Sequence, residues 1–119
     1  MNPVTGLSLG RVAIGAVALG NPALAGKLFQ LDVEANPQLP YLARLFGSRE
    51  VALGLVTLLS TGRTRRNLVL VGLAVDAADA ATGYLGIQDG SVSRTTGLAL
   101  VGPALGAMVA GARGLLPGA

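Results

Sequence analysis

The chain has 119 residues, of which 51% are hydrophobic, 13% are charged and 3% are aromatic. About 25% of the residues of a soluble globular domain are charged, so half that share, with a mean hydropathy of +0.61, indicates that lipid surrounds most of the surface. Disordered chains are poor in apolar residues, which excludes disorder. The chain has no Cys and no His, which excludes disulfides, thiolate or imidazole metal sites and His- or Cys-based nucleophile relays. We therefore expect no cofactor and no metal.

Nine Lys and Arg residues against six Asp and Glu residues leave a net charge of +3 at pH 7. Nucleic-acid-binding domains usually gather their bases on one face or stripe, and no such stripe with interleaved aromatic residues is present here. We therefore expect no nucleic acid partner. Three of the bases, Arg63, Arg65 and Arg66, lie in one short polar break, which is typical of a cytoplasmic loop of a membrane protein.

The first apolar stretch runs from about residue 5 to residue 25 and is interrupted by Arg11. The polar segment after it contains Pro37 and Pro40, and proline in a helix interior removes a hydrogen bond, so a continuous helix through this segment is disfavoured. An alternative for the first stretch is a signal peptide, because Ala23-Leu24-Ala25 has the small-x-small form of a cleavage site. No basic segment precedes the apolar run, which argues against cleavage. Cleavage would leave three helices and remove Arg11.

Three further apolar stretches follow. They span about residues 41–61, 67–87 and 95–112, separated by the polar break 62–66 and a turn at 88–91. Asn67 is of a type favoured as a helix N-cap and opens the third stretch. A helix needs about 20 residues to cross a hydrocarbon core of roughly 30 Å. The four stretches, counting 5–25, therefore predict an all-α fold, a bundle of four transmembrane helices with short loops, forming one integral membrane domain over residues 1–119.

The alternative to this membrane bundle is a soluble four-helix protein. Only the stretch 95–112 is free of charged residues, and the stretches 41–61 and 67–87 qualify as spans only if their charges face the bundle interior. A soluble helix shows a stripe of apolar residues on one side. The runs 68–71 and 98–101 instead cover all sides of a helical turn, which favours the membrane.

The distribution of bases predicts the orientation of the four helices. The face that contains both termini has Arg63, Arg65, Arg66 and Arg113. The opposite face has Lys27 and Arg94, diluted by Asp32, Glu34 and Asp89. Cytoplasmic loops carry the excess of Lys and Arg, so we expect a multi-pass protein of the inner (plasma) membrane with both termini in the cytoplasm.

Glycines at a spacing of four predict where helices pack closely. Gly6 and Gly10 lie on one face of the first predicted helix, and Gly102 and Gly106 lie on one face of the fourth. Two small residues at this spacing permit close approach of a neighbouring backbone. We therefore expect packing seams at both pairs.

The charged residues within the predicted spans are the most informative feature. They are Arg11, Arg49, Glu50, Asp76 and Asp79, with Arg44 nearer an interface and able to extend toward it. A central Arg or Asp costs on the order of 2.5 to 3.5 kcal/mol to insert, so these residues are expected to pair. A rise of 1.5 Å per residue places opposite charges at similar depths, about 10 Å from the cytoplasmic end for Arg11 and about 13 Å for Asp76.

Depth and spacing together predict the partners. Asp76 and Asp79 are three residues apart and share a helix face. We expect Arg49 to pair with Asp79 and Arg11 to pair with Asp76, because each pair lies at similar depth. Glu50 points about 100° away from Arg49 and is expected to face another neighbour. With Arg44 included, three bases balance three acids.

Such a network is compatible with several functions. A balanced network stabilises the bundle and fixes its register without chemistry. Alternatively, Asp76, Asp79 or Glu50 acts as a general acid or base on a lipophilic substrate, or the carboxylates relay protons in a carrier. A metal site at Asp76, Asp79 and Glu50 is the weakest option, since the neighbouring arginines repel a cation.

The segment 41–54, YLARLFGSREVALG, preceded by GRVAIG at 10–15 and the break at Asn21-Pro22, resembles an uncharacterised group of small bacterial membrane proteins within the DoxX-like superfamily. The resemblance implies a four-helix membrane bundle and matches the positions of Arg11, Arg44, Arg49 and Glu50. Some DoxX-like proteins are associated with quinone or thiol redox systems. The absence of Cys removes any thiol step by this chain itself.

These observations predict a small integral membrane protein in a structural or accessory role, with a buried Arg/Asp/Glu network. A membrane enzyme of isomerase or epoxide-opening type is the alternative, with Asp76 and Asp79 as acid and base and Arg49 orienting them. A proton-coupled carrier is the third hypothesis. The expected partner is the lipid bilayer, and a homo-oligomer, a larger membrane complex and a lipophilic ligand remain open.

Overall fold

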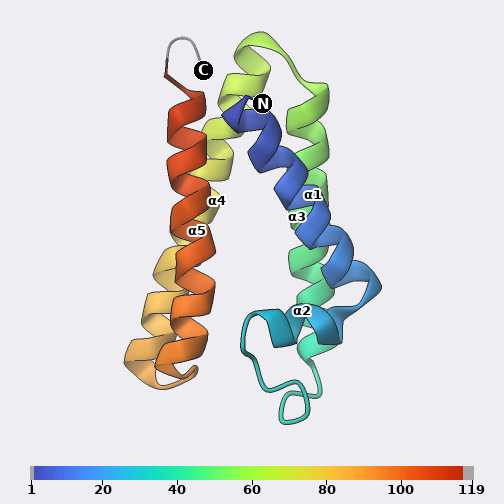
Figure 1. The fold of residues 1–119 in the computed structure, drawn as a ribbon, viewed down its shortest axis with the longest axis vertical. Coiled ribbons are helices and arrows are strands. Elements are labelled where there is room, and N and C mark those ends of the chain that lie inside the picture. Colours follow the sequence, from blue (N-terminus) through green and yellow to red (C-terminus); the bar gives the residue numbers. More distant parts are fainter. Residues whose placement is uncertain (1, 117–119) are drawn as a thin grey trace.

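The computed structural model describes residues 2–116, which form five helices and no strand (Figure 1). The helices are α1 (Pro3–Gly20), α2 (Pro22–Leu28), α3 (Leu39–Leu59), α4 (Gly62–Asp89) and α5 (Arg94–Gly114). The described part of the chain measures 45 × 29 × 19 Å along its principal axes. The predicted all-α helical bundle is therefore confirmed, with four long helices and one short helix.

The four long helices form two closely packed pairs, α1 with α3 and α4 with α5. The pairs meet through smaller contacts between α1 and α5 and between α3 and α4. Both chain ends and the α3–α4 turn lie at one end of the bundle, and α2 with the loop after it lies at the opposite end (Figure 1). The two ends of the bundle therefore contain different loops and helix ends.

Glycines allow the backbones of α1 and α3 to approach each other. A Cβ atom added at Gly15 would lie 2.7 Å from the carbonyl oxygen of Gly47, and one added at Gly54 would lie 2.7 Å from the carbonyl oxygen of Ser8. In α4, a Cβ atom added at Gly83 would lie 2.7 Å from Cγ2 of Val101 on α5. These positions have no room for a larger side chain, so the glycines set the closeness of both pairs.

The predicted glycine seams are wrong. An added Cβ at Gly10, Gly102 or Gly106 would meet no atom within 4 Å, and Gly6 is exposed. A spacing of four residues places two glycines on one helix face but does not say which face is buried. Here the buried face of α1 carries Ser8, Arg11 and Gly15, so Gly6 and Gly10 point outward.

The first predicted helix, 5–25, is two helices. α1 ends at Gly20, and Asn21 accepts a hydrogen bond at its side-chain oxygen from the Leu24 amide, 3.2 Å away. Pro22 is the first residue of α2, where its missing N–H is tolerated. The pair Asn21-Pro22 therefore ends one helix and begins the next, and Ala23-Leu24-Ala25 lies in α2.

The third predicted helix, 67–87, begins too late and ends slightly too early. α4 has 28 residues, its N-cap is Thr61, and Asn67 lies inside the helix. Arginine is a good helix former, so the polar run 62–66 forms the first turns of α4 and not a loop. Gly90 ends the helix with a left-handed φ of 78°, a conformation that glycine adopts without strain.

Three of the helices, α1, α4 and α5, are long and apolar enough to cross a membrane, judged by length and composition. α3 has 21 residues, which is a sufficient length, but Arg44, Arg49 and Glu50 lie within it. The structure therefore supports a helical bundle with three candidate spans, and the predicted count of four spans is not confirmed.

Candidate functional site

Arg11 of α1 is the centre of a buried charge network. Its Nη1 donates to Oε2 of Glu50 on α3 at 3.0 Å and to Oδ1 of Asp76 on α4 at 3.0 Å, and its Nη2 donates to Oδ2 of Asp76 at 2.5 Å. The three side chains are at most 7% exposed. The Arg11 guanidinium therefore joins three helices, through a bidentate ion pair with Asp76 and a single hydrogen bond to Glu50.

Small residues make room for this guanidinium. A Cβ atom added at Gly72 would lie 3.1 Å from Nη2 of Arg11, and one added at Gly54 would lie 3.2 Å from Cβ of Arg11. Gly72 precedes Asp76 by four residues and Gly54 follows Glu50 by four, so each glycine shares a helix face with one of the carboxylates. Each of the two glycines therefore leaves room for the Arg11 side chain beside the carboxylate that binds it.

Arg49 of α3 extends the network outward. Its Nη1 and Nη2 donate to the two carboxylate oxygens of Asp79 on α4 at 3.3 Å and 2.8 Å, and its Nη2 also donates to Oε1 of Glu50 at 3.0 Å. Glu50 thus accepts from Arg11 at one oxygen and from Arg49 at the other. The result is a chain of alternating charge, Asp76–Arg11–Glu50–Arg49–Asp79.

The outer end of this chain is open to the surroundings. The Arg49 side chain is 40% exposed and that of Asp79 is 33% exposed. The Arg49 guanidinium carbon lies 5.3 Å from the centre of the Phe46 ring, within the range of a cation–π contact. Phe46 in turn meets Phe29 edge to face at 5.9 Å between ring centres, so aromatic packing supports Arg49 on one side.

The predicted pairs Arg11–Asp76 and Arg49–Asp79 are confirmed. Glu50 does turn to another neighbour, Arg11, but it also binds Arg49 beside it in the sequence, which the prediction did not include. Arg44 is exposed, and the ion pairs found among residues 2–116 do not include it. The network therefore has two bases and three acids, not the predicted three of each.

Buried polar groups in the described part of the chain are all satisfied: no buried side-chain nitrogen or oxygen atom there lacks a hydrogen-bond partner. A cavity of about 10 Å³ lies beside Ser8, Arg11, Thr57 and Gly72, which is the volume that one water molecule requires. The network carboxylates do not line this cavity. Within residues 2–116, no cluster of three or more acidic side chains is arranged to hold a metal ion.

No protein-family model, curated protein or solved structure matches this chain. Sequence reasoning missed two contributors to the site, Gly54 and Gly72. Their spacing of four residues from Glu50 and Asp76 was a signal available in the sequence.

Proposed function

We propose that this chain is an integral membrane protein of the inner membrane that crosses the bilayer four times. Its burial pattern supports this proposal because its interior holds as many polar and charged residues as hydrophobic ones, six of each, whereas soluble proteins bury mainly hydrophobic residues. The buried polar and charged residues are Ser8, Arg11, Glu50, Thr57, Asp76 and Thr96. Large apolar side chains are exposed on all four long helices, for example Leu9, Leu55, Leu70 and Leu105.

α3 is proposed as the fourth span, alongside the three apolar helices α1, α4 and α5. Glu50 is buried and bonded, and Arg49 is bonded to two carboxylates, so neither requires a partner from the lipid. Arg44 lies five residues from the start of α3, about 8 Å along the helix, and its long side chain can reach the interface. A four-helix bundle also fits the DoxX-like resemblance, which remains a prediction.

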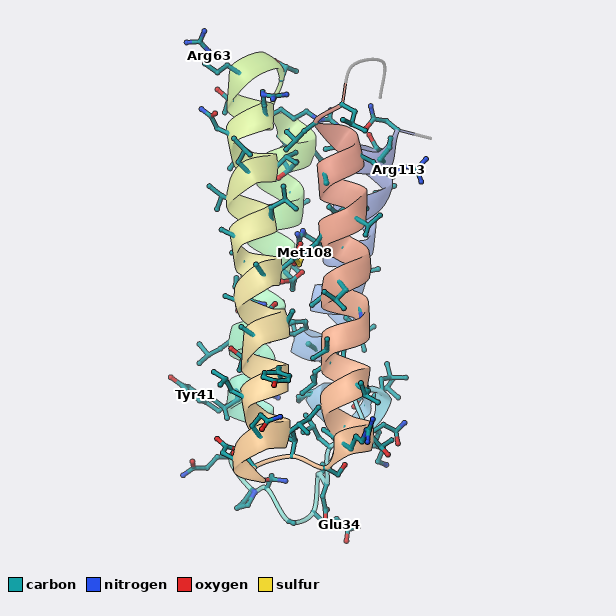
Figure 2. All side chains as sticks on the ribbon, turned by 90° about the vertical axis from the view of Figure 1, so that its left-hand side faces the viewer. Glu34, Tyr41, Arg63, Met108 and Arg113 are labelled. Atoms are coloured by element: carbon teal, nitrogen blue, oxygen red, sulfur yellow. The ribbon has the colours of Figure 1, made fainter. Side chains whose placement is uncertain are left out.

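The orientation follows from the two ends of the bundle. Figure 2 shows Arg63 and Arg113 at one end and Glu34 at the other. The arginine-bearing end also carries both chain ends (Figure 1), and the more basic side of a membrane protein faces the cytoplasm. We therefore propose cytoplasmic termini.

The topology is tested with single cysteines, since the chain has no native Cys. Glu34→Cys, Thr64→Cys and Gln88→Cys are each exposed positions in loops or helix ends. With four spans, a membrane-impermeant maleimide labels Glu34→Cys and Gln88→Cys on intact cells without an outer membrane, and it leaves Thr64→Cys unlabelled until lysis. Equal labelling of Glu34→Cys and Thr64→Cys would mean that α3 does not cross.

Within the membrane, we propose that the charge network holds the helices in register and that the chain acts as a structural or accessory subunit. The single observation that carries this is the continuous chain of bonded charges joining α1, α3 and α4. The carboxylates are bonded to arginines and do not line the cavity of about 10 Å³ beside Arg11. Both features favour stabilisation over catalysis.

The structural role is tested by a double-mutant cycle of Arg49→Ala and Asp79→Asn, with thermal unfolding measured in one detergent. Both single changes are expected to lower stability, and the double change is expected to cost less than the sum of the two. The expected coupling is about 0.5 to 3 kcal/mol, the range for residues of one hydrogen-bonded ion-pair network. Additive costs would mean that the two residues act independently.

The partial exposure of Asp79 favours a second candidate function, acid–base chemistry on a lipophilic molecule. Of the three carboxylates, Asp79 is the one that an external ligand can approach, with 33% of its side chain exposed. Arg49 holds both of its oxygens and would orient it. In that case, Asp79→Asn would abolish turnover of a lipophilic substrate and leave the melting temperature almost unchanged.

A further inference from the structure

Three helix ends are joined at the end of the bundle that carries both termini. Nη2 of Arg65 on α4 donates to Oγ1 of Thr5 on α1 at 3.0 Å, and Nη1 of Arg66 donates to the carbonyl oxygen of Leu115 after α5 at 3.2 Å. Gly114 packs against the side chain of Val4, so closely that a Cβ atom would clash. Two arginines therefore hold their guanidinium groups at a fixed junction of α1, α4 and α5.

Among the described residues, this junction gathers four arginines and no acidic residue. Arg63 and Arg113 extend from the same end (Figure 2). We call Arg63, Arg65, Arg66 and Arg113 the arginine end. The described residues around it, 2–5, 59–66 and 112–116, contain no Asp or Glu, and the acceptors of Arg65 and Arg66 are a neutral hydroxyl and a neutral carbonyl. A counter-charge for the four guanidinium groups has to come from outside this part of the chain.

The length of α4 sets the level of the arginine end in a bilayer. Its 28 residues extend about 42 Å, whereas the hydrocarbon core is roughly 30 Å thick. If the excess is shared between both ends, about four residues project on each side, which places residues 62–65 at the level of the lipid headgroups. Phosphate groups lie at this level, and guanidinium is the side-chain group that best binds phosphate by paired hydrogen bonds.

Apolar side chains lie beside these arginines. Leu59 at the end of α3 is 84% exposed and Leu116 after α5 is 62% exposed. A ligand that satisfies both features has an anionic headgroup and an acyl chain. A soluble phosphate or a nucleic acid would satisfy only the arginines.

We propose that the arginine end binds the headgroup of an anionic phospholipid, with the guanidinium groups bonded to its phosphate oxygens and its acyl chain against the neighbouring leucines. This inference rests on the proposed membrane insertion. The opposite end provides a contrast within the same molecule, since its two bases, Lys27 and Arg94, are accompanied by Asp32, Glu34 and Asp89. The inference predicts selective binding at one end of the bundle.

The test uses the full chain in a neutral detergent, titrated with phosphatidylglycerol or phosphatidylcholine and followed by native mass spectrometry. Arg63→Gln/Arg113→Gln is the test variant, because the described structure gives neither side chain a hydrogen bond that folding would lose. Lys27→Gln/Arg94→Gln is the matched control, since it removes the same charge from the other end. Carbonate extraction of membranes and the melting temperature are measured for each protein.

The wild type is expected to prefer phosphatidylglycerol. The test variant is expected to bind it about 25-fold more weakly, about fivefold for each arginine, and the control is expected to bind like the wild type. Equal weakening in both variants, or no preference in the wild type, would overturn the inference. Glycerol phosphate without acyl chains is not expected to compete, and full competition would identify a soluble anion as the ligand. Release of the wild type by carbonate would refute the membrane proposal itself, separately from the lipid preference.

Discussion

Arg11 and Arg49 each bind two carboxylates and share Glu50, yet their surroundings differ. The Arg11 side chain is 7% exposed and joins α1 to α3 and α4, whereas that of Arg49 is 40% exposed and joins α3 to α4. Removing one partner of an ion pair that the protein encloses leaves a charge that water and lipid headgroups cannot reach, whereas a long charged side chain on the bundle surface can extend toward headgroups or admit water. The inner half of the network, Arg11 with Glu50 and Asp76, is therefore a structural joint. The outer half, Arg49 with Asp79, tolerates substitution better.

The largest expected effect is at the inner half. Arg11→Met keeps an unbranched apolar stem but leaves Glu50 without its inner partner and Asp76 without any of its ion pairs. Removing one member of a buried pair costs about 3 to 5 kcal/mol, so the free energy of unfolding in detergent is expected to fall by this amount. Chemical denaturation followed by circular dichroism measures the change.

Arg44→Met is the matched control, since it makes the same substitution at an exposed position of α3. It is expected to change stability by less than about 0.5 kcal/mol. If Arg11→Met were as mild as Arg44→Met, the inner half would not be a structural joint, and the comparison between the two arginines would fail.

An intermediate effect is expected where α1 and α3 approach beside Arg11. In Gly54→Ala, the new Cβ would lie 2.7 Å from the carbonyl oxygen of Ser8 and 2.8 Å from Cγ2 of Val12. The helices have to move apart, which strains the Arg11–Glu50 bond and costs about 1 to 3 kcal/mol. Thermal unfolding measures it, with Gly10→Ala as the control.

At Gly10 an added Cβ meets no atom within 4 Å. Alanine favours the helix by up to about 1 kcal/mol relative to glycine, so Gly10→Ala is expected to be neutral or slightly stabilising. If Gly54→Ala lowers stability and Gly10→Ala does not, close helix packing is confined to the side of α1 that carries Arg11. A loss of stability in Gly10→Ala would instead indicate that the outer face of α1 is covered in the membrane.

Sequence reasoning predicted the ion pairs better than the helix contacts. Depth along a helix follows directly from residue number, so Arg11 and Asp76 were matched without any structure. The buried face of a helix depends on its neighbours, and the spacing of Gly6 and Gly10 carries no information about them. The same limit explains Arg44, because a charge near a helix end is compatible with both the network and the interface.

The bounds of the helices cannot be predicted from the apolar pattern alone. Polar residues at 62–66 interrupt an apolar pattern, which predicts a loop there. Helix formation depends on backbone propensity as well as on polarity, and arginine has a high helix propensity. The structure accordingly begins α4 at Gly62. The break at Asn21-Pro22 is visible in the sequence, but the apolar pattern continues across it, so residues 5–25 are predicted as one span and not as two helices.

The smallest expected effect is at the outer half of the network. Arg49→Lys keeps the charge but replaces a planar fork by a single ammonium group, which cannot bind both oxygens of Asp79 in parallel while also reaching Glu50. Because the charge is kept and only hydrogen bonds are lost, the expected loss of stability is about 0.5 to 1.5 kcal/mol, measured by thermal unfolding in detergent. A loss of several kcal/mol would mean that water and headgroups reach Arg49 no better than they reach Arg11, and the two halves of the network would then form one buried unit.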